Sequence, residues 1–251
     1  MNIIGIIPAR YNSTRLIGKP LLQLKSKSMV QRVYENAKQA KSLKAVYIAT
    51  DDKRIYNHAK NIGANVIMTS PEHQNGTSRC NEAVSLIQEE YDFIVNIQGD
   101  EPLLEASVID ALCNHAIKSN SDIATTISYI RDKTELLSKE EAKVVTRLDG
   151  YALYFSRSVI PYLQNTTIEE ALNNNIYKKH LGLYIFKKEV LNFICSLKAS
   201  FLSENESLEQ LTWLEHGLKI LTVIVNSCSI PVDTKEDVIK IIQILEARNI
   251  N

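Results

Sequence analysis

The chain has 251 residues, and its 29 basic and 29 acidic side chains give a formal net charge of zero. This balance argues against bulk electrostatic attraction to nucleic acid or to an acidic membrane, so an anion site requires a local cluster of cations. No apolar run reaches the length of a membrane span, and no secretory leader precedes the first apolar stretch, which predicts a cytoplasmic protein. The four cysteines are far apart in the sequence and are expected to be reduced thiols.

The first half of the chain alternates short apolar runs with segments of helical periodicity. Strands are predicted at 3–7, 45–49, 65–69 and 93–97, with amphipathic helices between them. This alternation predicts an α/β fold with a mostly parallel sheet flanked by helices. Ligands bind at the carboxyl ends of the strands of such sheets, so the loops after residues 7, 49 and 97 are expected to converge on one crevice.

The second half is less regular. The stretch "AKVVTRLDGYALYFS" at 142–156 predicts two strands joined by a turn, because Asp-Gly is a strong hairpin signal. Further strands are predicted at 180–186 and 220–225. Helices are predicted at 207–217, where Gly217 closes the helix, and at 234–247, with Thr234 as N-cap. The polar segment 165–176 is expected to be a loop, and no repeat or linker divides residues 1–251, which read as a single domain.

Three cations lie on the loop that follows the first predicted strand, in "IPARYNSTRLIGKP". Arg10, Arg15 and Lys19 can each donate to a phosphate oxygen. The stretch has neither the GxGxxG pattern of a dinucleotide site nor the GxxxxGK[ST] pattern of a P-loop. A solvated loop with scattered cations is the alternative, but the position beyond a buried strand favours anion binding.

Carboxylates follow the strand at 93–97 in "NIQGDEPLL". Asp100 and Glu101 suit a hard divalent ion such as Mg²⁺, and Gly99 permits close approach of the backbone; an acidic turn is the alternative. Asp233 precedes a predicted helix, where an aspartate is usually a cap. It becomes a candidate metal ligand only if it lies beside Asp100.

The segment "EHQNGTSR" at 72–79 predicts the start of another helix, with Thr77 or Ser78 as caps. Arg79 falls in the first turn, where a cation opposes the helix dipole. This position indicates either an anionic ligand or a surface ion pair. His73 alone is expected to be structural.

Seven segments, in order over nearly the whole chain, resemble signatures of the 3-deoxy-manno-octulosonate (KDO) cytidylyltransferase family, the CMP-KDO synthetases: "IPARYNSTRLIGKPL", "HQNGTSR", "VNIQGDEPL", "YALYFSRSVIP", "KHLGLYIF", "SLEQLTWLEHG" and "VDTKED". The resemblance implies a Rossmann-like nucleotide-diphospho-sugar transferase fold with a small dimerisation and sugar-binding lobe at about 130–190. It also implies a homodimer, Mg²⁺ as cofactor, and CTP and KDO as substrates. In the implied reaction the anomeric hydroxyl of KDO attacks the α-phosphorus of CTP, giving pyrophosphate and CMP-KDO for lipopolysaccharide synthesis.

The resemblance also implies roles for individual residues. The nucleotide would be bound by Ala9, Arg10, Ser13, Arg15, Lys19, Gln74, Gly76 and Arg79. The metal would be held by Asp100 and Asp233. The sugar would be bound by Gln98, Arg157, His180, Tyr184, Glu209 and Gln210. Lys19, Asp100, Asp233 and Arg157 form the expected catalytic set. Adjacent Glu209 and Gln210 can face one sugar only at the end of a helix.

The chain departs from the family pattern in four places. Ile17 stands where proline is usual, Ser78 where an acidic residue is common, and Thr212 where arginine is common, and the segment "SENESLEQL" lacks the proline and the basic residue often found before this helix. These departures leave 8-amino-KDO or a nonulosonic acid open as the sugar. A non-catalytic nucleotide-binding protein is the remaining alternative, although the basic loop and both carboxylates are present.

Overall fold

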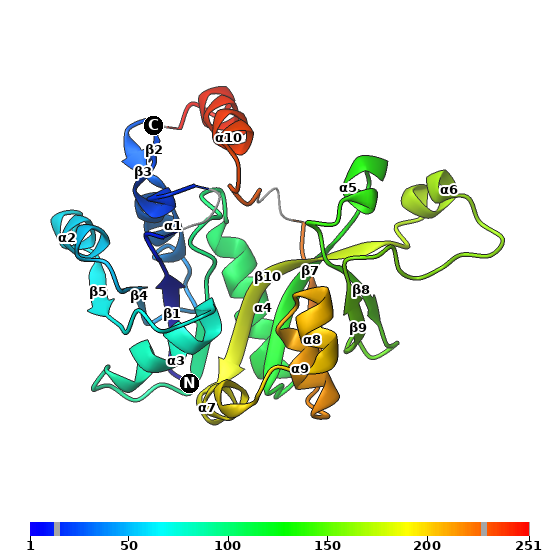
Figure 1. The fold of residues 1–251 in the computed structure, drawn as a ribbon, viewed down its shortest axis with the longest axis horizontal. Helices are drawn as coiled ribbons and strands as arrows, with labels where there is room; N and C mark the ends of the chain where they lie inside the picture. The colour runs from blue at the N-terminus through cyan, green and yellow to red at the C-terminus, as the bar shows by residue number, and fades with distance from the viewer. Residues whose placement is uncertain (13–15, 227–229, 251) are drawn as a thin grey trace. The chain divides into compact units, whose positions relative to one another are not determined.

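The computed structural model of the protein describes residues 1–12, 16–226 and 230–250. The chain forms two compact units, Met1–Asp110 with Ser227–Asn251, and Ala111–Asn226 (Figure 1). Residues 130–190, where a small lobe is expected, fall within the range of the second unit, which is larger than that span.

The first unit is built on parallel strands. Strand β1 (Ile3–Pro8) lies between β6 (Phe93–Asn96) and β4 (Ala45–Thr50), and β5 (Asn65–Met68) pairs with the far side of β4. Residues 3–7 are all buried, as expected for a central strand covered on both faces. Helices α1 (Met29–Ala37), α2 (Lys53–Asn61) and α3 (Gly76–Ser85) pack against these strands. The four strands predicted in this half are confirmed.

Capping residues set the helix boundaries in this unit. Asp52 accepts a hydrogen bond from a backbone N–H of the first turn of α2, and Gly63, with φ of 71°, follows the end of that helix as expected. The N-cap of α3 is Asn75, whose side chain accepts the Ser78 N–H. The expectation of Thr77 or Ser78 as cap was therefore wrong. Asparagine caps at least as well as serine or threonine, so the start of this helix moves upstream.

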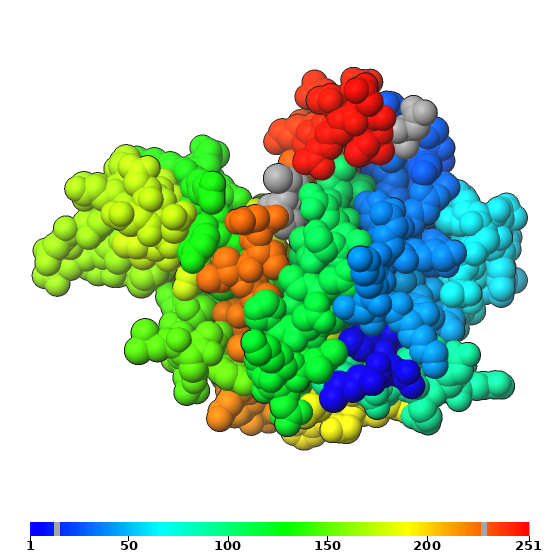
Figure 2. All heavy atoms as spheres, turned by 180° about the vertical axis from the view of Figure 1, so that it is seen from behind, coloured from blue at the N-terminus to red at the C-terminus, as the bar shows by residue number. Residues whose placement is uncertain are grey.

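The C-terminal helix α10 (Lys235–Ala247) completes the first unit. It lies beside the short hairpin of β2 (Gln23–Leu24) and β3 (Lys27–Ser28), where Figures 1 and 2 show the red helix next to the blue N-terminal part of the chain. Buried side chains from both ends of the sequence form one cluster there: Leu24, Met29, Leu103, Val232, Ile241 and Leu245. The predicted N-cap Thr234 is confirmed, and Asp237 closes a capping box with it.

The second unit has mixed strand directions. Strand β7 (Ile123–Tyr129) is antiparallel to β10 (Lys178–Lys187) and parallel to β11 (Ile220–Ile224). The predicted hairpin is confirmed as β8 (Lys143–Thr146) and β9 (Ala152–Ser156), with Gly150 at φ of 87° in its turn. Strand β7 lies in a stretch to which the sequence patterns assigned no element. The α/β class with mostly parallel, mixed strands is confirmed.

The remaining helices are mostly short: α4 (Ala106–Lys118), α5 (Lys133–Leu137), α6 (Ile168–Asn173), α7 (Lys188–Ser196), α8 (Phe201–Glu206) and α9 (Gln210–Glu215). The expectation of a loop at 165–176 was wrong, because α6 occupies it. A capping box of Thr167 and Glu170 starts α6, and its Ala171 and Leu172 are buried with Ile130. The helix expected at 207–217 is the shorter α9.

None of the helices in the described part of the chain combines the length and the apolar character needed to cross a bilayer.

Candidate functional site

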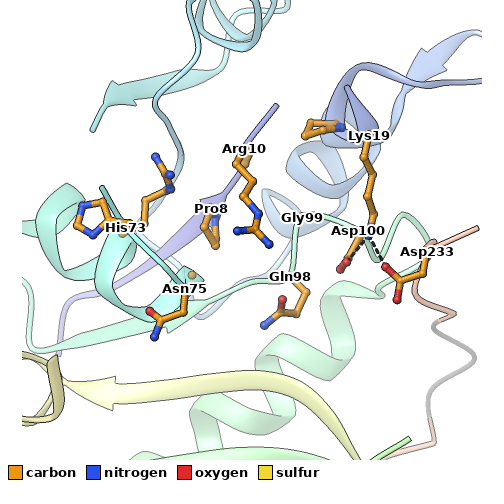
Figure 3. Close-up of a pocket in the computed structure, with 13 residues that line it drawn as sticks. Pro8, Arg10, Lys19, His73, Asn75, Gln98, Gly99, Asp100 and Asp233 are labelled. Atoms are coloured by element: carbon orange, nitrogen blue, oxygen red, sulfur yellow. Dashed lines mark hydrogen bonds and ion pairs between the residues drawn. The ribbon is translucent and has the colours of Figure 1, made fainter. Parts of the chain in front are cut away.

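A cavity of about 230 Å³ opens in the first unit at the carboxyl ends of its strands. Its walls come from the loops after β1 and β6, the start of α3 and the segment before α10 (Figure 3). The lining residues are Pro8, Ala9, Arg10, Lys19, Pro20, His73, Asn75, Gly76, Arg79, Gln98, Gly99, Asp100 and Asp233. The cavity therefore brings together eight of the predicted site residues: Ala9, Arg10, Lys19, Gly76, Arg79, Gln98, Asp100 and Asp233. Gln74 is exposed and does not line it, and Ser13 and Arg15 lie outside the described residues.

Lys19 joins the two carboxylates that the sequence singled out. Its Nζ donates to Asp100 Oδ2 at 2.6 Å and to Asp233 Oδ1 at 2.9 Å (Figure 3). The Val232 N–H donates to the Asp100 carbonyl at 3.0 Å, which fixes the segment before α10 against the loop after β6. The condition for Asp233 to act with Asp100 is met, and Thr234 rather than Asp233 caps the helix.

The backbone around Gly18 directs Lys19 toward the carboxylates. Gly18 has φ of 71°, and its N–H donates to the Tyr11 carbonyl at 2.9 Å. A Cβ at Gly18 would lie 3.1 Å from the Tyr11 ring, so both the left-handed conformation and the close contact favour glycine. The Arg54 guanidinium lies 3.2 Å from the centroid of the same ring. Lys19 then begins the short turn η1 (Lys19–Leu21), with Pro20 as its second residue.

Gly99 makes the close backbone approach that the sequence predicted. A Cβ at Gly99 would lie 2.8 Å from the Pro8 carbonyl oxygen, a distance that requires the backbone to move. Pro8 and Gly99 both line the cavity, so the glycine sets the spacing of two cavity loops.

Gly99→Ala is expected to separate these two loops. Overpacking of this kind costs about 1 to 3 kcal/mol, so the free energy of unfolding should fall by that amount in urea denaturation. Unchanged stability would contradict the role of the close approach.

Arg79 is a buried cavity residue with an acidic partner. It is 3% exposed, donates through Nη1 to Thr69 Oγ1 at 2.6 Å, and pairs with Asp51 Oδ1 at 3.3 Å. Of the three loops expected at the crevice, the one after β4 therefore reaches the cavity through the Asp51–Arg79 contact. An ion pair was one of the two alternatives that the sequence indicated for Arg79, and it is present with the arginine buried.

His73 and its neighbours hold the segment that precedes α3. The His73 Nε2 contacts Glu82 Oε2, and Nδ1 lies 3.1 Å from Ser78 Oγ. The Ser70 N–H also donates to the Glu82 carboxylate at 2.9 Å. Burial alone would raise the pKa of Glu82, but the hydrogen bonds from His73 and Ser70 outweigh it and hold that pKa below its usual value. Ser78, one of the departures from the family pattern, thus contacts a residue that lines the cavity.

Two of the residues expected to bind the sugar, Tyr184 and Gln210, are buried in the second unit. Tyr184 and Gln210 are 2% and 3% exposed. Within the described ranges, the Tyr184 hydroxyl and Gln210 Nε2 are buried side-chain atoms without a hydrogen-bond partner. Burial, reinforced by the Glu209 carboxylate, raises the pKa of Tyr184 well above its ordinary value. Trp213, one turn after Gln210, contacts the Tyr184 ring with centroids 5.2 Å apart, so the two groups belong to neighbouring elements.

The helix end required for Glu209 and Gln210 is present. Glu209 is the N-cap of α9 and Gln210 is the first residue of that helix. The side chains of two adjacent residues at a helix end can face the same region, which is the condition for both to contact one sugar.

Arg157 makes its contacts with main-chain oxygens. Its Nε donates to the Glu206 carbonyl at 2.8 Å, Nη1 to the carbonyls of Lys139 and Glu140 at 3.0 Å, and Nη2 to that of Ser207 at 3.2 Å. A guanidinium has five N–H donors, so most of this one is directed at the chain itself. In this conformation Arg157 ties the 139–140 segment to the end of α8.

Lys143 has a buried role that the sequence did not predict. Its Nζ is enclosed by three carbonyls, those of Ser138, Glu141 at 2.8 Å and Arg157 at 3.0 Å, and the residue is fully buried. Burial lowers the pKa of Lys143. No pattern announces this role, because a lysine within an apolar strand normally points to solvent.

His180 is expected to make stability depend on pH. It is half-buried, its Nε2 lies 2.9 Å from Thr125 Oγ1, and burial lowers its pKa from 6.5 to about 3. Below pH 6.5 His180 is protonated in the unfolded chain but stays neutral in the folded chain. The free energy of unfolding is therefore unaffected by His180 above pH 6.5 and falls between pH 6.5 and 3, by up to about 1.4 kcal/mol per pH unit. Urea midpoints between pH 7 and pH 4 should therefore fall less steeply for His180→Asn than for the wild type. Parallel curves would show that His180 titrates normally in the folded protein.

Comparison with known proteins identifies the family. Residues 4–220 match the family model described as cytidylyltransferase. A 3-deoxy-manno-octulosonate cytidylyltransferase of Parabacteroides distasonis is 44% identical over 252 residues, which cover 99% of this chain and 100% of that protein. The chain belongs to the 3-deoxy-manno-octulosonate cytidylyltransferase family. The predicted resemblance is thereby confirmed, and so is the nucleotidyltransferase class.

Other relatives extend the family match. The 3-deoxy-manno-octulosonate cytidylyltransferase of Fusobacterium nucleatum is 44% identical, covering 100% of this chain and 99% of its own. A relative from Arabidopsis thaliana, named as mitochondrial, is 40% identical and covers 99% of this chain and 85% of its own. A solved structure of a CMP:2-keto-3-deoxy-manno-octonic acid synthetase complexed with CTP superposes with a TM-score of 0.91 at 34% identity, over 99% of this chain and 100% of that one.

Proposed function

We propose that the protein transfers CMP from CTP to the anomeric hydroxyl of KDO, giving pyrophosphate and CMP-KDO for lipopolysaccharide synthesis. The observation that carries the proposal is the meeting of Lys19, Asp100 and Asp233 in one cavity, in a member of this family. These are the groups that a transfer between a triphosphate and a hydroxyl requires: a cation for the phosphates and carboxylates for a metal.

The nucleotide half of the site is supported by cations and by backbone donors. Arg10 is exposed and lines the cavity, and Lys19 lines it as well. Asn75 and Gly76 place the N-terminus of α3 at the cavity, where backbone N–H groups favour an anion. Together they provide for a triphosphate without a glycine-rich phosphate loop.

Asp100 and Asp233 fit the Mg²⁺ that the family implies. An ammonium already bridges them, which supports the sharing of one cation between both carboxylates. In the described residues no three His, Cys, Asp or Glu side chains cluster closely enough to hold an ion, so the two aspartates would need oxygens from substrate and water. Mg²⁺ characteristically accepts such a set. When bound, it would neutralise phosphate charge and lower the pKa of the attacking hydroxyl.

The second unit, taken by itself, contains groups suited to a polyhydroxylated acid. The unpartnered Tyr184 hydroxyl and Gln210 amide can satisfy sugar hydroxyls, which would remove the cost of leaving them buried and unpaired. Glu209, at the same helix end as Gln210, adds an acceptor. For Arg157 to bind the sugar carboxylate, some of its carbonyl contacts would have to be exchanged.

A coupled pyrophosphate-release assay with CTP and Mg²⁺ tests the proposal. KDO, 8-amino-KDO and a nonulosonic acid should be compared side by side, and KDO should give the highest kcat/KM. A higher value for 8-amino-KDO would transfer the proposal to that sugar. Binding of CTP without turnover on any of the three sugars, in folded protein, would indicate a non-catalytic nucleotide-binding protein.

The proposal includes the homodimer that the resemblance implies and the cytoplasmic location that the sequence predicts. Light scattering coupled to size-exclusion chromatography measures the first, and a mass equal to the 28.4 kDa of one chain would refute it.

A further inference from the structure

The Lys19 ammonium occupies the position between the two carboxylates. Its Nζ is within 2.9 Å of an oxygen of both Asp100 and Asp233, and its side chain is only 11% exposed. The two carboxylate side chains are 30% and 29% exposed, so all three groups are partly shielded from solvent. Such pairs are screened less than surface pairs, and the ammonium is a strong competitor for any other cation at these oxygens.

The contact is fixed by the backbone on both sides. The Tyr11 carbonyl and the left-handed Gly18 direct the lysine, and the Val232–Asp100 backbone hydrogen bond of 3.0 Å holds the two acidic segments together. The Asp233 N–H is also held, by the Asp237 carboxylate at 3.1 Å. A freely moving surface lysine would lose rotamer entropy in forming this bridge, whereas here the surrounding structure already sets its direction.

A triphosphate changes the balance for Lys19. Phosphate oxygens offer the ammonium alternative acceptors with more charge than a carboxylate, and Arg10 adds a second cation to the cavity lining. When the ammonium turns to a phosphate, both aspartates lose the bridging Lys19 ammonium at the same moment. Cation binding at the aspartates and nucleotide binding are then coupled, and the coupling acts equally in both directions.

We propose that Lys19 is an internal counter-ion that blocks the aspartate pair in the free protein and leaves it when the triphosphate arrives. This inference rests on the proposed metal role of Asp100 and Asp233. It adds that a divalent cation binds weakly to the free protein and is taken up with the nucleotide. While Lys19 bridges the two aspartates, they do not bind the cation. The apparent affinity for the cation therefore equals the affinity of the open pair multiplied by the fraction of molecules in which the pair is open.

Titration with Mn²⁺ alone, followed by the electron paramagnetic resonance signal of the free ion, tests this proposal without CTP, sugar or turnover. Lys19→Met should bind Mn²⁺ at least about tenfold more tightly than the wild type, because the competitor is gone. Arg10→Met removes a cavity cation other than the one that bridges the aspartates, and it should shift the affinity far less. The gain should vanish in the double variant Lys19→Met with Asp100→Asn.

Equal Mn²⁺ affinity in the wild type and Lys19→Met would overturn the proposal. An equal gain in Mn²⁺ affinity in Arg10→Met would also overturn it. The gain would then come from the loss of any positive charge in the cavity and not from the release of the aspartate pair. Circular dichroism reports folding, and Lys19→Gln, which keeps most of the side-chain length, replaces Lys19→Met if the latter fails to fold. Failure of the proposed function would appear separately, as absence of pyrophosphate release in a protein whose Lys19 variants still gain Mn²⁺.

Discussion

Asp100→Asn should lower kcat for CMP transfer by about a thousandfold, with the fold intact. The change removes one of two carboxylates and leaves Lys19 bridged to Asp233 alone. Loss of a single charge-stabilising group in a catalytic site typically costs a hundredfold to a thousandfold, and loss of a metal ligand lies at the upper end of that range. The measurement is the pyrophosphate-release rate at saturating CTP and KDO.

Two variants make the result specific. Asp233→Asn should show a similar loss, because Asp233 is the other member of the pair. Glu72→Gln neutralises an exposed carboxylate just before the cavity residue His73 and should leave kcat within about twofold. An Asp100→Asn enzyme with a near-normal rate would remove Asp100 from the proposed metal site.

Lys143→Met should destabilise the second unit more than any other single change discussed. The substitution leaves the carbonyls of Ser138, Glu141 and Arg157 without their shared donor. Each hydrogen bond to a charged group is worth about 1.5 to 3 kcal/mol, and removal of the buried ammonium offsets part of the sum, so we expect a loss of about 3 kcal/mol. Urea denaturation followed by Trp213 fluorescence measures it.

Lys139→Met is the matched control for this experiment. Lys139 is exposed and lies four positions before Lys143, so the same substitution should change stability by less than about 0.5 kcal/mol. Equal effects of the two substitutions would show that the three-carbonyl contact contributes nothing specific.

The site could be predicted wherever it depends on strand order. Lys19 and Asp100 follow neighbouring strands β1 and β6, and the rule that loops at the carboxyl ends converge brings them together. Gly99 was predictable for a similar reason, because a glycine at a strand end often marks a close approach of two backbones.

Asp233 could not be placed from its local sequence. A carboxylate before a helix has a capping role in most proteins, and only the packing of α10 on Leu24 and Met29 brings this one to Lys19. That packing is a tertiary event between the two ends of the sequence. Lys143 was missed for a related reason, since its three acceptors come from segments that meet only in the folded unit.

Helix α6 was missed although its sequence carries a signal. Thr167 and Glu170 have the spacing of a capping box, but the polar residues around them made the segment resemble a loop. Six residues are too few for a stable isolated helix, so α6 depends on burying Ala171 and Leu172 against Ile130 and Leu136. The polar composition of this segment does not predict α6, because the stability of the helix comes from its packing against neighbouring residues.

The distance along the chain between Lys19 and Asp233 has a consequence for biosynthesis. The two are 214 positions apart, whereas the basic loop and Asp100 both belong to the first half of the chain. During translation, β1, β6 and the Lys19–Asp100 contact can form while α10 has not yet been made. Asp233 is therefore the last of the three residues to be synthesised, and the complete contact of Lys19 with both aspartates can form only after the segment before α10 has left the ribosome.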